Sequence, residues 1–466
     1  MISFYPKQIS NKAITLYLLS IGVVSVAFTR FMMKPVFIII GIIGVLLFAL
    51  LTTYFTRKWE HMSEKQFVSR LFFWALGLRL AWVTFSFFFY TAQTGAPFEF
   101  GASDSRGYHE EAIWALDTGW SNAFDYWFHS RRSYGDAGYP LWLTFLYSIF
   151  GPSVYLARVV KSLFSSWMCI LIYRLTKRAI DEPTGRMAGI FCCCMPSLIM
   201  YCGLHVKETE MLFLTVAAIE RADKLFRDKQ INYFNLALVV ALVLSLFFFR
   251  TVLGATVAFA VFTGLVFSPR NSAAVSRFVL VAWAIIAVGV LAGGTIATEA
   301  QSTWENRTEN QSKKRESQVR RGNEWAQYAT STVMLPMMFV LPFPTMVDVD
   351  YQYNQQIINS GNFIRLFLGI FVVIAVTNAF FRRGRWRDIV IVCAFAASYL
   401  IVVGFSGFSN SERFLLPGMP FLLILSAYGI TSLQGKDMRW VRLWYIVVPV
   451  ACISWAFFKL GSRGIV

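Results

Sequence analysis

Charged residues are scarce in this sequence. Only 15% of its 466 residues are Asp, Glu, Lys or Arg, whereas a typical soluble domain has about 25%. Acidic residues are the rarer kind, with 26 against 43 basic residues. Hydrophobic residues make up 56% of the chain and aromatic residues 17%. This composition excludes a disordered chain, which needs low hydrophobicity, and it disfavours a soluble globular enzyme.

The seven cysteines show no pattern typical of a metal site or of a disulfide framework. All of them lie in apolar runs, and none has metal-ligand spacing to any of the four histidines. The triplet at 192–194 is most simply explained by packing at the depth of the lipid. We therefore expect no cofactor, and no motif supports a divalent metal.

Long runs without charge occur throughout the chain, for example at 36–51 and 278–292. Apolar stretches of about 20 residues are typical of membrane spans. The hydropathy pattern predicts an all-α polytopic membrane protein with about thirteen transmembrane helices. They are expected at 13–29, 35–55, 71–91, 158–176, 185–203, 209–220, 231–249, 251–267, 278–297, 363–381, 389–405, 414–432 and 441–458.

The net charge is +17, which in a soluble protein would indicate a nucleic-acid partner. With the N-terminus inside, however, the short cytoplasmic segments hold 23 of the 43 Lys and Arg residues. Membrane proteins concentrate these residues in cytoplasmic loops. The distribution of Lys and Arg therefore predicts the orientation of the chain in the membrane. We expect no binding to nucleic acid. The expected location is the inner (plasma) membrane of a bacterium, with the long loops facing the periplasm.

Two outer segments are long, and they divide the chain into four parts. Residues 1–67 are an N-terminal transmembrane hairpin and linker, and 68–297 are a transmembrane core that includes the first outer loop at 92–157. Residues 298–362 are the second outer loop, and 363–466 are the C-terminal transmembrane helices. Long loops with their own amphipathic pattern are where function tends to lie.

The first outer loop predicts two helices at the membrane surface. Ser103 is expected to cap the first, which places Asp104 in its first turn, Tyr108 on its apolar face and Gly119 at its end. The second, at 141–150, is too short to span a membrane. Asp104 has two interpretations that spacing does not separate: an acid at a helix N-terminus, or a general base for an acceptor hydroxyl.

A second acidic residue, Glu208, follows the fifth predicted span. The chain leaves the membrane there through His205, Lys207 and Glu208. These residues are expected at the level of the first loop. Ionisable groups at membrane depth are costly and are mostly functional or paired. The alternative is a local ion pair between Lys207 and Glu208 at a helix end.

Three arginines occupy similar positions at the outer edge of apolar runs: Arg250, Arg365 and Arg413. A guanidinium suits bidentate contact with phosphate. Each arginine alone can simply extend its side chain to the membrane surface. Together with Lys207, they predict a pocket for an anionic lipid headgroup.

At these motifs the sequence resembles the GT-C superfamily of polyprenol-phosphate-dependent membrane glycosyltransferases, such as protein O-mannosyltransferases and aminoarabinose transferases of lipid A. The resemblance covers 68–225 and, more loosely, 405–432. It is carried by SDSRGYH at 103–109, by GYPL at 138–141 with FGPS at 150–153, by YRLTKR at 173–178 with Glu208 beyond the next span, and by ERFLLP at 412–417.

The resemblance implies a GT-C-like fold and a sugar transfer with inversion from a polyprenyl-phosphate donor to a glycan, glycolipid or other acceptor in cell-envelope glycan biosynthesis. It implies Asp104 as catalytic base and Glu208 as the acid that assists the acceptor, donor or metal. Because Ser105 follows Asp104 where an acidic pair would be needed, it does not imply a metal. The candidate substrate-binding residues are Tyr108, His109, His205, Lys207, Arg250, Arg365 and Arg413.

Two other functions stay open at this point. One is an outer-leaflet polysaccharide polymerase or ligase that uses a lipid-diphosphate glycan. The other is a flippase for lipid-linked sugars, although a transporter should place paired charges or broken helices near mid-bilayer. Arg79 is the strongly charged residue expected deep in a span, and it fits a transport path poorly.

Overall fold

The computed structural model describes residues 3–130, 134–228, 232–267, 337–350, 352–382, 384–405 and 411–461. Within these ranges the chain is predominantly helical and forms no β-strand, only an isolated bridge between Met32 and Val347. The expected all-α class is confirmed for them. The α-helices are α1 (Lys7–Ala27), α2 (Pro35–Lys58), α3 (Glu64–Thr94), α4 (Ser103–Thr118), α5 (Trp120–Asp125), α6 (Gly138–Phe150), α7 (Val154–Ala179), α8 (Glu182–Cys194), α9 (Pro196–Met200), α10 (Glu208–Arg227), α11 (Tyr233–Phe249), α12 (Thr251–Phe267), α16 (Tyr353–Ile357), α17 (Asn359–Thr377), α18 (Trp386–Phe405), α19 (Glu412–Leu415), α20 (Met419–Thr431) and α21 (Met438–Gly461).

Eight helices among the described residues are long and apolar enough to cross a membrane, and each coincides with a predicted span. The predicted span at 185–203 coincides with a broken helix, α8 followed by Pro196–Gly203 at a bend of 50°, which adds a ninth candidate span if the pair is counted as one. α11 and α12 are apolar but shorter, at 17 residues each. The predicted span at 209–220 lies in α10, which carries acids in both halves. The span at 278–297 and most of the second outer loop lie outside the described residues, so the count of thirteen stays a prediction.

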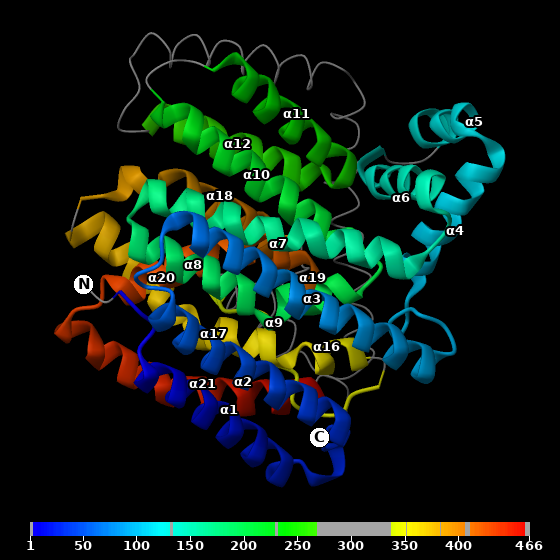
Figure 1. Cartoon of the computed structure of the whole chain (residues 1–466). Coiled ribbons are helices and arrows are strands. Elements are labelled where there is room, and N and C mark those ends of the chain that lie inside the picture. The colour runs from blue at the N-terminus through cyan, green and yellow to red at the C-terminus, as the bar shows by residue number, and fades with distance from the viewer. Residues whose placement is uncertain are drawn as a thin grey trace.

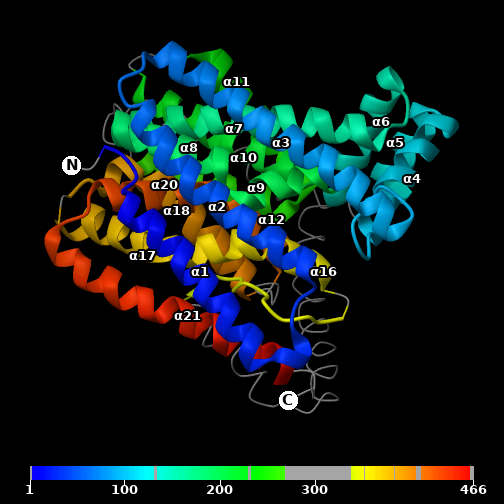
Figure 2. The same cartoon turned by 60° about the horizontal axis from the view of Figure 1, so that its bottom comes forward.

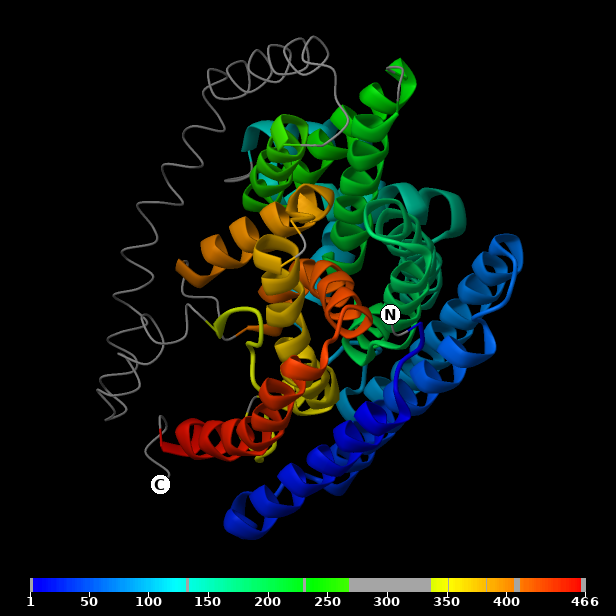
Figure 3. The ribbon, with the colours of Figure 1, turned by 90° about the vertical axis from the view of Figure 1, so that its left-hand side faces the viewer.

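The long helices lie side by side in a bundle. Figure 1 shows α4, α5 and α6 together at one end of the bundle and the N-terminus at the other, and Figure 2 keeps this arrangement. We call the end with α4–α6 the loop face and the other end the opposite face. At the centre, α7 packs against α3, α8 and α10, and α17 packs against α20. Figure 3 shows α1 and α2 on one flank and α11 and α12 on another.

Pro196 breaks the helix between α8 and α9, and Arg79 donates hydrogen bonds to carbonyls that the break leaves without a helical partner. Pro196 has no N–H, so it cannot donate to the carbonyl of Cys192 as a continuous helix would require. The Arg79 guanidinium donates to the carbonyls of Cys192 at 3.1 Å and Cys193 at 3.2 Å, and also to Ser165 Oγ at 2.7 Å. Because backbone groups inside a membrane must be satisfied internally, this buried arginine serves the fold.

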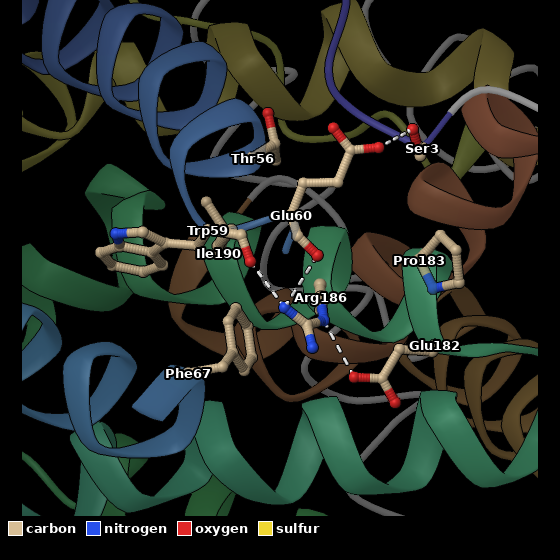
Figure 4. Close-up of a pocket in the computed structure, with 9 residues that line it drawn as sticks. All are labelled: Ser3, Thr56, Trp59, Glu60, Phe67, Glu182, Pro183, Arg186 and Ile190. Atoms are coloured by element: carbon tan, nitrogen blue, oxygen red, sulfur yellow. Dashed lines mark hydrogen bonds and ion pairs between the residues drawn. The ribbon is translucent and has the colours of Figure 1, made fainter. Parts of the chain in front are cut away.

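The N-terminal hairpin is fastened to the core by Arg186 of α8, at the centre of a small cavity on the opposite face (Figure 4). Its guanidinium donates to the carbonyls of Trp59 at 2.5 Å and Met62 at 2.7 Å, just beyond the end of α2, and to the carboxylate of Glu182 at 2.9 Å. The cavity is only about 110 Å³. Since every guanidinium nitrogen of Arg186 has a partner, we interpret this arginine as a structural link between α2 and α8.

Candidate active site

The helix that carries Asp104 begins one residue earlier than a Ser103 cap requires. Ala102 is the residue before the helix, and no side chain caps it, so the predicted Ser103 cap is wrong. The preceding turn contains Gly101 at φ 62°, a conformation that favours glycine. Asp104 lies in the first turn with its side chain 55% exposed. It accepts a hydrogen bond from Arg413 and makes no capping hydrogen bond.

Arg413 connects the two predicted acids. It lies in the short helix α19, and its guanidinium donates through one nitrogen to Asp104 and through another to Glu208. Asp104 and Arg413 are 309 residues apart in the chain. Glu208, the first residue of α10, is fully buried, whereas Asp104 faces outward. The structure thus joins both candidate catalytic residues through one cation.

Arg250 completes this cluster from the junction of α11 and α12. One of its guanidinium nitrogens lies 3.9 Å from Glu208 Oε1, and its charged carbon lies 4.5 Å from the ring centre of Phe414. Two atoms of the cluster are buried without a hydrogen-bond partner, Glu208 Oε2 and Arg250 Nη1. Such atoms are unusual in native proteins, and a water or a polar ligand would satisfy them.

Lys207 points away from its neighbour Glu208. Its ammonium pairs with Asp136 and donates to the carbonyl of Phe249 at 2.7 Å. The alternative of a local Lys207–Glu208 pair is therefore wrong. Burial lowers the pKa of Lys207, against the opposing effect of Asp136. Gly138 permits this arrangement, because a side chain there would meet the ring of Phe249 at 2.8 Å.

The candidates Tyr108, His109 and His205 pack against two tyrosines of α6. Tyr108 packs edge-on against Tyr139, with ring centres 5.1 Å apart. Tyr147 Oη connects the two histidines, at 2.8 Å from His109 Nδ1 and 3.2 Å from His205 Nε2. Burial lowers the pKa of His205 well below its ordinary value, and nearby Lys161 adds to this effect. His205 is therefore a neutral hydrogen-bonding group at neutral pH.

Arg365 lies apart from this cluster. It is buried in α17 and donates to the carbonyls of Met338 at 3.1 Å and Phe339 at 3.2 Å. The structure therefore brings Arg413 and Arg250 together at Glu208, whereas Lys207 bonds to Asp136 and Phe249 and Arg365 lies elsewhere.

Sequence reasoning missed two residues of the site, Asp136 and Lys161. Asp136 lies two residues before the Gly138-Tyr139 motif and pairs with Lys207. Lys161 in α7 is buried, donates to the carbonyls of Leu204 at 2.9 Å and Val206, and so holds the segment before α10 in place. A usable signal was Lys161 itself, a base three residues after Arg158 in a stretch of α7 that holds no other charge before Arg174.

An apolar groove of about 530 Å³ runs beside the charged cluster, between α5, α6, α7, α10 and α11. Its walls are mainly aromatic, and several of these side chains are 39–50% exposed, including Phe124, Phe145 and Phe248. Phe249 lines the groove with its ring, while its carbonyl accepts from Lys207. The groove therefore joins the cations to the apolar surface of the bundle.

Within the described residues, no group of three or more His, Cys, Asp or Glu side chains is placed to hold a metal ion. No family model matches this chain, and no curated protein matches it. The Asp104–Arg413–Glu208 cluster and the motif resemblance are therefore the features that bear on function.

Proposed function

We propose that this protein is an inverting membrane glycosyltransferase with a GT-C-type fold. It transfers a sugar from a polyprenyl-phosphate donor to a glycan, glycolipid or other acceptor on the loop face, which is the periplasmic face of a bacterial inner membrane. One observation carries the proposal: exposed Asp104 and buried Glu208 share the guanidinium of Arg413, beside two further cations and an apolar groove.

The cations suit the phosphate of the donor. Arg413 and Arg250 meet at Glu208 on the loop face, with Lys207 next to Glu208 in the chain, and a phosphate can accept several charge-assisted hydrogen bonds at once. Arg413 pairs with a buried carboxylate on one side and with an exposed one on the other. A phosphate entering from the loop face therefore displaces Asp104 more easily than Glu208. Donor binding then frees the Asp104 carboxylate for the acceptor.

The groove suits the lipid of the donor. Its aromatic wall adjoins Phe249, so an isoprenoid chain lying in it would leave its phosphate near Lys207. Burial of such a chain contributes about 25 cal/mol for each Å² of apolar surface removed from water. Nucleotide sugars are normally absent outside the cytoplasm, so a transferase on this face needs a donor carried across the membrane on a lipid.

The proposed chemistry is a single displacement at the anomeric carbon. The acceptor hydroxyl oxygen forms the new bond to that carbon and gives its proton to Asp104. The bond from the anomeric carbon to the phosphate oxygen breaks, and its electron pair leaves with the polyprenyl phosphate. Arg413 and Arg250 stabilise the departing phosphate, while Glu208 holds both guanidiniums in place. Positioning and charge stabilisation supply most of the rate.

The test is mass spectrometry of surface glycans and lipid-linked intermediates in a null strain that carries either the wild-type gene or Asp104→Asn. Loss of one sugar from each repeat or glycolipid, in both the null strain and the variant, is the expected result. Intact single repeats that fail to join would instead identify a polymerase or ligase. Precursors trapped on the inner leaflet, with Asp104→Asn still active, would identify a flippase and end the proposal.

A further inference from the structure

A second groove lies on the opposite face, between the two helices of the N-terminal hairpin. It measures about 580 Å³ and is wide open to the surroundings of the bundle. Three basic residues line it, Lys7 at the start of α1 and Arg57 and Lys58 at the end of α2. The remaining lining residues are Ser10, Asn11, Leu50, Thr53 and Tyr54.

The three cations are exposed and have no carboxylate partner among the described residues. Arg57 lies 4.9 Å from the ring centre of Phe4, and Lys58 lies 4.9 Å from that of Tyr54 and donates to its hydroxyl. By contrast, Lys177 and Arg178 on the same face pair with acids. The groove therefore concentrates uncompensated positive charge.

An apolar stripe on α2 leads away from this charge into the bundle's lipid-facing surface. Ile43, Leu47, Leu50 and Tyr54 are between 41% and 54% exposed, and their spacing of three and four residues places them on one side of the helix. The rise from Ile43 to Tyr54 is about 16 Å. One leaflet of the hydrocarbon core is about 15 Å deep.

We propose that this groove is a binding site for one anionic phospholipid of the leaflet on the opposite face. The headgroup phosphate contacts Lys7, Arg57 and Lys58, and Asn11 and Tyr54 offer hydrogen bonds to the rest of the headgroup. An acyl chain follows the stripe on α2. Basic pockets between transmembrane helices are suited to anionic headgroups. This site is independent of the proposed transferase activity.

The charge of the groove argues against a second copy of this chain as its occupant. A twofold contact would bring the same patch together on both copies, and like charges placed opposite one another are unfavourable. An anionic lipid has a negative headgroup that can neutralise the three cations. It also has an acyl chain that can cover the exposed apolar side chains of α2.

The experiment is native mass spectrometry of the purified full-length protein with phosphatidylglycerol or phosphatidylcholine of identical acyl chains. The expected result is one retained phosphatidylglycerol, with at least fivefold preference over phosphatidylcholine. Lys7→Gln/Arg57→Gln/Lys58→Gln should lose that preference. The matched control is Lys436→Gln/Arg439→Gln/Arg442→Gln, which removes three cations near a separate surface depression lined by Lys436 and Arg439. It should retain the lipid.

Equal retention of the two lipids by the wild type would overturn the proposal, since this comparison does not depend on the folding of any variant. Equal loss in both triple variants would also overturn it, because the attraction would then belong to the whole face. Displacement of the lipid by millimolar inorganic phosphate would assign the groove to a soluble anion instead. Gel-filtration profiles and thermal unfolding in detergent confirm that the variants are folded.

Discussion

Two arginines of this protein, fully buried Arg79 and half-buried Arg413, differ in the partners that satisfy them. Arg79 donates to three backbone carbonyls, two of which, Cys192 and Cys193, lie at the break before Pro196. Arg413 donates to two carboxylate side chains, one of which faces outward. Backbone carbonyls stay where the fold puts them, whereas an exposed carboxylate can be displaced by another anion. Burial alone therefore does not mark an arginine as functional. A partner that a bound anion can displace does.

The comparison predicts the largest effect for Asp104→Asn. If Asp104 is the general base, transfer should fall about a thousandfold, which is the usual range for losing such a group. Folding should be unchanged, because the amide oxygen of the substituted side chain can still accept from Arg413. The measurement is sugar transfer by purified enzyme in detergent, and Asp117→Asn, an exposed acid at the other end of α4, is the control. Near-normal transfer would contradict the assignment.

Arg79→Met should act on stability alone. It leaves the carbonyls of Cys192 and Cys193 without their donors inside the bundle. The free energy of unfolding should fall by about 3 kcal/mol, since each unsatisfied buried group costs about 1–3 kcal/mol. Thermal unfolding in detergent measures this, with exposed Arg174→Met of α7 as control. A lower turnover per folded molecule would mean that Arg79 also takes part in the reaction. The proposed difference between Arg79 and Arg413 would then be wrong.

Asp104→Ala should tighten the binding of a sugar-free polyprenyl phosphate about tenfold, or about 1.4 kcal/mol. The reason is that Asp104 competes with the phosphate for Arg413. Tryptophan fluorescence titration of the purified protein measures the affinity, and Asp117→Ala should leave it unchanged. Unaltered affinity in Asp104→Ala would mean that donor binding does not release the carboxylate. Absence of any binding by the wild type would count against the transferase itself.

His205 should make stability depend on pH. Because burial lowers its pKa, the folded state stays neutral below the ordinary value of about 6.5 while the unfolded state takes up a proton. Stability is therefore fully present above that pH and falls as pH decreases, by up to about 1.4 kcal/mol per unit. His205→Gln should flatten this slope in unfolding measurements from pH 7 to 5. A slope that persists in the variant would assign the effect to other groups.

Much of the architecture was predictable because hydropathy is a local property. All eight of the long apolar helices coincide with predicted spans, and the first loop contains the expected surface helix ending at Gly119. The bend at Pro196 was not predicted, although its cause is a single residue. α5 was also missed, because six residues rich in aromatic side chains give no clear helical period.

The sequence by itself determined the membrane class and the positions of the eight long apolar helices, since these follow from composition and short-range pattern. It did not distinguish Arg413, which joins Asp104 to Glu208, from Arg365, which binds the carbonyls of Met338 and Phe339. It also left open a local pair of Lys207 with Glu208, whereas the structure pairs Lys207 with Asp136. Only the tertiary structure decided these pairings, because ion pairs between residues tens to hundreds of positions apart depend on how the helices pack.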